Sequence, residues 1–372
     1  MNERYNLAFL NFIRIFLAIS ITFWHCVGCQ FGFNFENYRI LEIWRYFTVC
    51  GGNQVFFLIS GMTFFLAYYP KLSQQKLTIK KFLAKRAIKI YPLATAATLF
   101  AFLIAVLRTF MLKGENSFSF NQLFLDLVFF GNTIFRYGYG FYNGPIWYLA
   151  SLFFCYLVAA LIISLTRKKP CAVWFVIPLF IGIYICEAGG TLPFFNNFQL
   201  GMGLYNFFSG FFFMPILQRI IRLGKIKLSI LRVVCFLFAC ATITLFIKKD
   251  FSTSYFGNGD VAFNLVIWMP LFIALYGTKI NALFYNKFFD FLGELSFSIY
   301  VIHIALNAAF NFTVDLFNLD GIATSIFLIY YAVLAVVAIS ATWGFKRLGK
   351  ALSDKLFTPS EQPKTLYEEK AA

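Results

Sequence analysis

Charged residues are scarce in this 372-residue chain, at 13% of the total, and acidic residues are scarcer still, with 16 Asp and Glu against 32 Lys and Arg. Hydrophobic residues make up 60% of the chain, and the mean hydropathy is +0.73. This composition excludes a soluble globular protein. The apolar runs are also too long, and alternate too little with polar residues, for an outer-membrane β-barrel. The sequence therefore predicts a helical membrane protein.

Long polar stretches are missing as well, because apolar runs long enough to cross a bilayer as helices follow one another along the chain. We expect an all-α polytopic fold with about ten transmembrane helices, in a single domain over residues 1–350, followed by a short polar tail over 351–372. The run at 121–135 is shorter and carries Asp126, so we expect it to be re-entrant or interfacial. The predicted spans lie at about 7–27, 47–69, 93–112, 146–166, 171–189, 203–218, 229–247, 261–277, 290–310 and 322–344.

The net charge of +16 is distributed unevenly between the loops. Lys and Arg gather in every second loop, beginning with 70–92, whereas the alternate loops, such as 28–46 and 113–145, are poorer in basic residues. Short cytoplasmic loops collect basic residues, so we predict that both termini are cytoplasmic. Membrane orientation explains the charge better than a nucleic-acid partner does, and we expect none.

Reactive side chains are few. The eight cysteines fall mostly inside or at the edges of apolar runs, as small buried hydrophobic residues do. Cys26 and Cys29 form one C-x-x-C without a second ligand pair, so we expect no metal site. The first apolar run carries Arg14 and His25 and lacks a small-residue cleavage site. We therefore expect it to remain as a membrane anchor.

Only two histidines are present, and both lie inside apolar runs. With the predicted topology, His25 lies near the outer end of the first span and His303 in the outer half of the ninth. A polar group within a span is costly unless it is paired or faces a cavity, so both are candidates for function. The alternative is that each is a satisfied interfacial histidine. Only these two side chains have an ordinary pKa suited to a base at neutral pH.

Other polar residues share helix faces with the histidines. Arg14 precedes His25 by eleven residues, which places both on one face about 16 Å apart along the axis. Arg14 could hold a ligand, or it could pair with an acidic residue elsewhere. In the ninth span, Ser296, Tyr300, His303 and Asn307 form one polar stripe that could orient the imidazole.

Two further segments have both a functional and a structural interpretation. Ser60 and Gly61 in the second span could belong to a site or to a helix-packing face. The loop 70–92 holds seven Lys and Arg and no acid, and it predicts a basic amphipathic helix on the cytoplasmic surface. That helix could attract lipid headgroups or a polyphosphate ligand such as coenzyme A. Aromatic rings at 135–145 could stack on a sugar or form an interfacial belt.

Taken in order, these segments resemble the acyltransferase 3 family, integral membrane enzymes that transfer acyl groups, usually acetyl, to sugars and other hydroxyl acceptors. The resemblance covers nearly the whole chain. It is carried by Arg14 and His25 in LNFIRIFLAISITFWH, by FFLISG at 56–61, by KRAIKIYP at 85–92, by GPIWYL at 144–149 and by LSFSIYVIH at 295–303. Lys89 stands where a second arginine is common, and Leu152 where some members carry Glu. We expect no hydrolase-like domain of the kind fused to some relatives, because the chain looks closer to the shorter, single-domain members.

The resemblance implies a membrane O-acyltransferase that uses acetyl-CoA and a glycan or lipid-linked saccharide in a bacterial cytoplasmic membrane. His25 would act as the base, or would carry the acyl group as an acyl-histidine. Ser60, Tyr300 and His303 would orient groups or stabilise the oxyanion. The donor would be held by Arg14, Lys85, Arg86 and Lys89.

Two other functions remain open on the sequence. A transporter of glycans or lipid-linked sugars would also have ten spans and intramembrane polar residues, although its two halves are expected to show repeat symmetry, which we do not find. A membrane acyltransferase of another class would share the chemistry but not the motifs. The acceptor sugar, the acyl group and the oligomeric state do not follow from the sequence.

Overall fold

The computed structural model describes residues 3–27, 52–112, 118–128, 142–166, 172–187, 198–248, 264–319 and 323–357. Within these ranges the chain forms helices and turns and no strand, which confirms the all-α prediction. The loop 28–46, most of the aromatic stretch at 135–145 and the tail after Phe357 lie outside the described residues.

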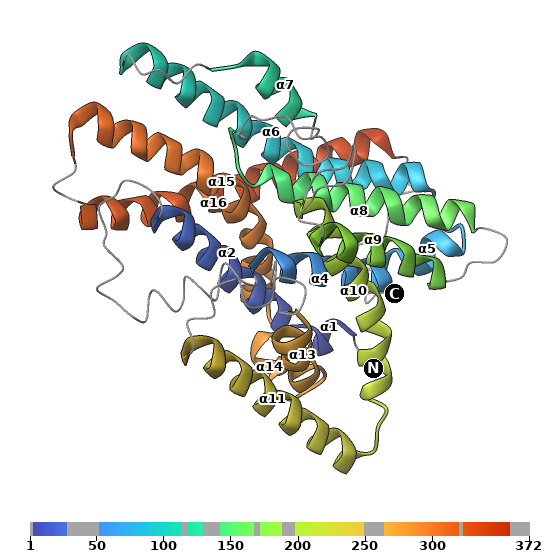
Figure 1. The fold of residues 1–372 in the computed structure, drawn as a ribbon. Coiled ribbons are helices and arrows are strands. Elements are labelled where there is room, and N and C mark those ends of the chain that lie inside the picture. The colour runs from blue at the N-terminus through green and yellow to red at the C-terminus, as the bar shows by residue number, and fades with distance from the viewer. Residues whose placement is uncertain are drawn as a thin grey trace.

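Helices account for most of the described chain (Figure 1). Six described helices are long and apolar enough to cross a membrane, and four further apolar helices are shorter. Each of the ten predicted spans coincides with one of these ten helical segments, while the number of crossings and the orientation stay predictions. The elements are α1 Glu3–Asn6, α2 Phe9–Val27, α4 Gly52–Ala67, α5 Tyr69–Ser73, α6 Ile79–Met111, α7 Phe120–Leu127, α8 Ile146–Leu165, η2 Ala172–Phe175, α9 Val176–Glu187, α10 Phe198–Ile220, α11 Lys225–Lys248, η4 Asn264–Trp268, α13 Met269–Leu275, α14 Asn281–Phe284, α15 Lys287–Phe317 and α16 Ala323–Leu356.

The basic segment before the third predicted span differs from the prediction. It does not form a separate surface helix, because α6 begins at Ile79 and runs without a break for 33 residues. The Thr78 side chain caps the new helix by accepting a hydrogen bond from the Lys81 amide. Pro92 lies inside α6 and does not end it. Five of the seven basic residues therefore lie on the first turns of a helix long enough to cross the membrane, which fixes their positions relative to its apolar part: Lys80, Lys81, Lys85, Arg86 and Lys89.

The short run at 121–135 contributes α7, whose eight residues span about 12 Å and cannot cross a bilayer. Asp126 is fully buried on this helix. Its carboxylate accepts hydrogen bonds from the Gln122 side chain at 2.6 Å and from the Tyr142 amide at 3.0 Å. Burial raises the pKa of Asp126 to about 6. These bonds tie α7 to the segment that leads into α8.

The central crossing of the bundle brings α4 against α10 through two glycines. A Cβ on Gly61 would lie 1.8 Å from the Phe207 carbonyl oxygen, and one on Gly210 would lie 2.0 Å from the Leu58 carbonyl oxygen. Only glycine allows two helix backbones to approach so closely. Of the two interpretations of Ser60 and Gly61, helix packing therefore applies to Gly61.

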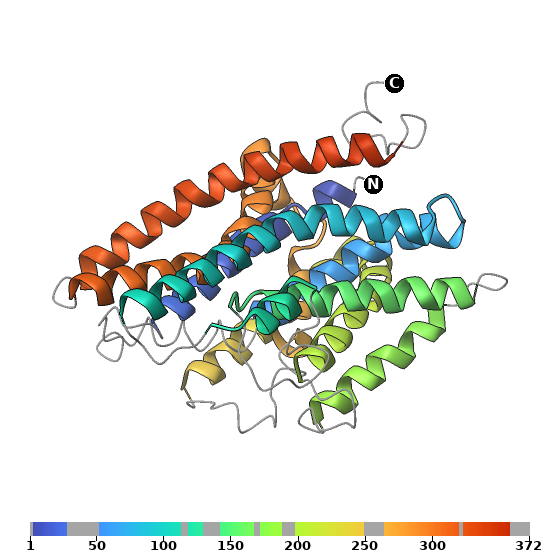
Figure 2. The same cartoon turned by 90° about the horizontal axis from the view of Figure 1, so that it is seen from above.

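The helices differ in how deeply they are buried. Of the most apolar 18 residues, 83% are buried within the protein in α10 and 6% in α11. Accordingly, α10 packs among α4, α8 and α9, whereas α11 lies at the edge of the bundle (Figure 1). In Figure 2, α1 and the last turns of α16 lie toward the same end of the bundle.

Candidate active site

The two histidines meet where α2 packs against α15. Nε2 of His303 lies 2.9 Å from Nδ1 of His25, and the ring centroids are 4.9 Å apart. His303 is fully buried, whereas His25 is half-buried. The sequence predicted that the two histidines lie at a similar depth and toward the same side of the membrane. The structure adds direct contact between residues 278 positions apart.

Hydrogen bonds determine which nitrogen of each neutral ring carries the proton. Nδ1 of His303 lies 2.7 Å from the Tyr300 carbonyl oxygen, which can only accept, so this nitrogen is the donor. Nε2 of His303 is then an acceptor, and Nδ1 of His25 must donate to it. His25 also forms a hydrogen bond with the Ile21 carbonyl, which draws on the same N–H. The lone pair of His25 is therefore left on Nε2.

Backbone and side-chain contacts fix the neighbourhood of His303. The Tyr330 hydroxyl donates to the His303 carbonyl at 3.0 Å, and the Asn307 amide lies 3.5 Å from the His25 carbonyl oxygen. The predicted polar stripe contributes differently from expectation. Tyr300 orients the imidazole through its backbone carbonyl, while the Ser296 hydroxyl donates to Gly293 of its own helix. Close packing turns these side chains toward partners that the periodicity alone does not reveal.

A tyrosine that the sequence analysis did not single out connects Ser60 with the histidines. The side chains of Ser60 and Tyr148 are hydrogen-bonded. The Tyr148 ring packs edge to face on Tyr300 at 5.2 Å, and the Tyr300 ring lies 5.8 Å from that of His303. Tyr148 belongs to the GPIWYL segment, so this motif could have identified Tyr148 as a site residue from the sequence. The predicted site residues Ser60, Tyr300, His303 and His25 thus lie in one connected group.

Basic residues converge at the other end of α2. Arg86 stacks its guanidinium on the Tyr68 ring at 4.2 Å, and it lies 5.6 Å from the Tyr156 ring. Lys89 interacts electrostatically with both Arg86 and Arg14. We call Arg14, Arg86 and Lys89 the basic cluster. Three residues predicted to hold the donor are therefore brought together.

Arg14 joins this cluster to the aromatic group. Its guanidinium lies 3.5 Å from the Thr63 hydroxyl and interacts electrostatically with Tyr148. Lys85, also predicted to hold the donor, points elsewhere: its ammonium lies 5.2 Å from the centroid of the Phe357 ring. The arrangement is a row of polar and aromatic side chains from the basic cluster, past Tyr148, to the histidine pair.

Asn143 donates to the Val301 carbonyl at 3.1 Å, two residues before His303 on α15. The segment held by Asp126 is therefore anchored beside the histidine pair. The rings at 135–141 lie outside the described residues, as does Cys29 of the C-x-x-C. Among the described residues, no three His, Cys, Asp or Glu side chains are grouped as a metal site would need.

Comparison with known proteins identifies one family. The family model for an acyltransferase domain, acyltransferase 3, matches residues 7–347. Comparisons with curated proteins and with solved structures return no match. The match includes both histidines and the basic cluster and covers nearly the whole chain, which therefore belongs to the acyltransferase 3 family and is a multi-pass membrane acyltransferase.

Proposed function

We propose that this protein transfers an acetyl group from cytoplasmic acetyl-CoA to a hydroxyl of a surface or lipid-linked glycan, at the cytoplasmic membrane of a bacterium. The observation that carries the proposal is the contact between His303 and His25, which leaves a lone pair on Nε2 of His25. A general base needs an unprotonated nitrogen held in one orientation, and this pair supplies it.

In the direct mechanism, Nε2 of His25 takes the proton of the acceptor hydroxyl while the oxygen attacks the thioester carbonyl. The carbonyl oxygen becomes an oxyanion, and its collapse breaks the carbon–sulfur bond. The imidazolium returns the proton to the departing thiolate, so the products are the ester and free coenzyme A. Ser60 and Tyr300 are proposed to orient the reacting groups or to stabilise the oxyanion.

In the variant mechanism, Nε2 of His25 attacks the thioester itself, and an acyl-histidine forms as coenzyme A leaves. The acceptor hydroxyl then takes the acyl group and restores the imidazole. This route suits a donor and an acceptor that approach from opposite sides of a membrane. Labelled acetyl-CoA supplied without an acceptor would leave acetyl on a His25 peptide in mass spectrometry, whereas direct transfer would leave none.

We propose the basic cluster as the donor site, with Lys85 at its edge. Coenzyme A carries its phosphates at one end and its thioester at the end of a long, flexible arm. Arg14 lies about 16 Å along α2 from His25, so phosphates at the cluster could direct the arm along Tyr148 toward the histidines. Arg14→Lys would test directed bonding, because lysine keeps the charge but lacks the planar fork.

The decisive test compares His25→Ala with Thr22→Val in purified protein. Thr22 is buried one turn earlier on α2, and its hydroxyl donates to the Ala18 carbonyl of the same helix. Release of the coenzyme A thiol from acetyl-CoA should fall by about 10²–10⁴-fold in His25→Ala, the usual contribution of a general base. Thr22→Val should remain close to the wild type. Full activity in His25→Ala would refute the mechanism, and a wild type that never cleaves acetyl-CoA would favour a transporter.

The acceptor requires a separate experiment. Mass spectrometry of surface glycans from cells with and without the gene should show the loss of one acetyl mass per modified sugar. An unchanged glycan profile, together with activity on another hydroxyl compound, would overturn the glycan assignment while leaving acyl transfer in place.

A further inference from the structure

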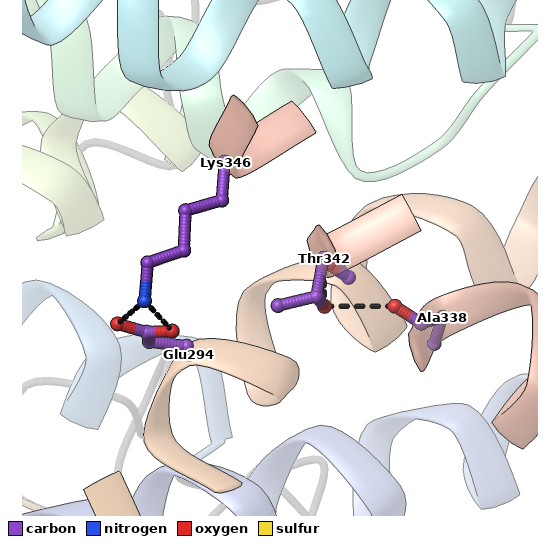
Figure 3. A network of polar contacts seen from close by, with 5 residues as sticks. Glu294, Ala338, Thr342 and Lys346 are labelled. Carbon is purple, nitrogen blue, oxygen red and sulfur yellow. Dashed lines mark hydrogen bonds and ion pairs between the residues drawn. The ribbon is translucent and has the colours of Figure 1, made fainter. Parts of the chain in front are cut away.

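An ion pair joins α15 to α16 beside the basic cluster. The Lys346 ammonium lies 2.9 Å and 2.8 Å from the two carboxylate oxygens of Glu294 (Figure 3). The two side chains are 68% and 48% exposed. An ion pair this accessible is screened by water and contributes little to stability, so holding the helices together is a weak explanation for it.

Packing one turn earlier on α16 sets where Lys346 stands. The Thr342 hydroxyl donates to the Ala338 carbonyl of its own helix (Figure 3). The Ser298 hydroxyl of α15 lies 2.7 Å from the Thr342 hydroxyl oxygen. Thr342 is buried against α15. The register between the two helices is thus fixed without the ion pair, and Lys346 follows four residues later on the same face.

The pair is electrostatically connected to the predicted donor site. Lys89 interacts with Arg86, Arg14, Glu294 and Lys346. Four cations and one carboxylate give a net charge of +3 for these five residues, from four minus one. Like charges gathered beside low-dielectric walls repel one another and attract an anion of several charges. Glu294 balances only one of the four.

We propose that Lys346 is a further ligand of the donor's phosphates, and that Glu294 is its counter-ion until the donor binds. Phosphate oxygens then replace the carboxylate at the Lys346 ammonium, which rotates on a flexible stem and needs no helix movement. Glu294 therefore opposes anion binding, and Lys346 favours it. This inference rests on the proposed donor site and extends it from α2 and α6 to α15 and α16.

The test exploits the opposite roles of the two residues. Binding of coenzyme A to Lys346→Gln, Glu294→Gln and Arg347→Gln protein would be measured by calorimetry in detergent, at low and at high salt. Arg347 is the matched control, because it is the adjacent cation and lies about 100° around α16. Lys346→Gln should weaken binding roughly tenfold, as expected for a lost charge-assisted contact. Glu294→Gln should strengthen binding, and Arg347→Gln should not change it. High salt should reduce both effects.

Thermal unfolding of the ligand-free variants tests the competing interpretation, in which the ion pair only holds α15 and α16 together. If the pair is a structural clip, both variants will weaken coenzyme A binding in the same direction and lower the melting temperature together. That result would overturn this inference and leave the proposed function standing. Wild-type protein that binds no coenzyme A would overturn both the inference and the donor assignment. Opposite effects at Lys346 and Glu294, with transfer intact in His25→Ala, would support the inference and refute only the proposed mechanism.

Discussion

Replacing His303 separates its role from that of His25. In the structure, Nε2 of His303 accepts a hydrogen bond from His25 at 2.9 Å. In the proposed mechanism His303 orients His25 and does not react with either substrate. His303→Ala removes the acceptor and lets the His25 ring turn or change its tautomer. His303→Gln places an amide oxygen at a similar reach and keeps an acceptor. Activity should therefore fall in His303→Ala and recover in part in His303→Gln.

The size of the effect follows from the contact that is lost. His303→Ala removes one of the hydrogen bonds that hold the His25 ring, while the bond to the Ile21 carbonyl stays, and one hydrogen bond of this kind contributes about 0.5–1.5 kcal/mol. At about 1.36 kcal/mol per tenfold change in rate, this loss lowers kcat roughly 2- to 13-fold in His303→Ala. The loss should be smaller than that in His25→Ala, where the base itself is removed. KM for acetyl-CoA should change little, because the basic cluster is at the other end of α2.

The assay is the initial rate of coenzyme A thiol release in detergent, measured across acetyl-CoA concentrations and between pH 6 and pH 9 for all three variants. Intact folding would be checked by thermal unfolding. If His303→Ala is as inactive as His25→Ala and glutamine restores nothing, His303 is itself the base and the tautomer argument is wrong. If His303→Ala retains full activity, the contact has no catalytic role.

Three further predictions concern packing, titration and donor binding. Gly61→Ala should destabilise the protein by about 3 kcal/mol or more, because its Cβ would meet a backbone oxygen at 1.8 Å, whereas Gly224→Ala, with nothing within 4 Å, should be tolerated in thermal unfolding. The pKa of Asp126, which lies outside the predicted spans, is raised by burial from 3.8 to about 6, so its contribution to stability is present at pH 4 and is lost as the pH rises through 6. Asp126→Asn should remove this part of the pH dependence, and an unchanged pH profile would show that the carboxyl does not titrate there. Arg86→Ala should raise the apparent KM for acetyl-CoA in a salt-sensitive way, and by more than Lys85→Ala does, because the Lys85 side chain lies over Phe357. Equal increases in KM would show that the donor is not bound at the basic cluster in preference to Lys85.

The sequence by itself determined that this is a helical membrane protein and where its apolar segments lie. An apolar run of about twenty residues can cross a membrane only as an α-helix, because a backbone in lipid must satisfy its hydrogen bonds within its own segment. The same arithmetic placed His25 and His303 at a shared depth, since each position along a span is fixed by its distance from the span's ends. The motif order was also enough to identify the family, because motifs do not depend on how helices pack.

Only the tertiary structure decided which faces meet. It brought the histidines to 2.9 Å and turned Lys85 away from Arg86 and toward Phe357. It also assigned Gly61 to a helix crossing and extended α6 through the basic residues that periodicity had placed on a separate helix. Within a bilayer, nearly every face of these helices is apolar enough to meet either lipid or protein. The choice between neighbours is therefore made by close packing between residues far apart in the chain, which hydropathy does not encode.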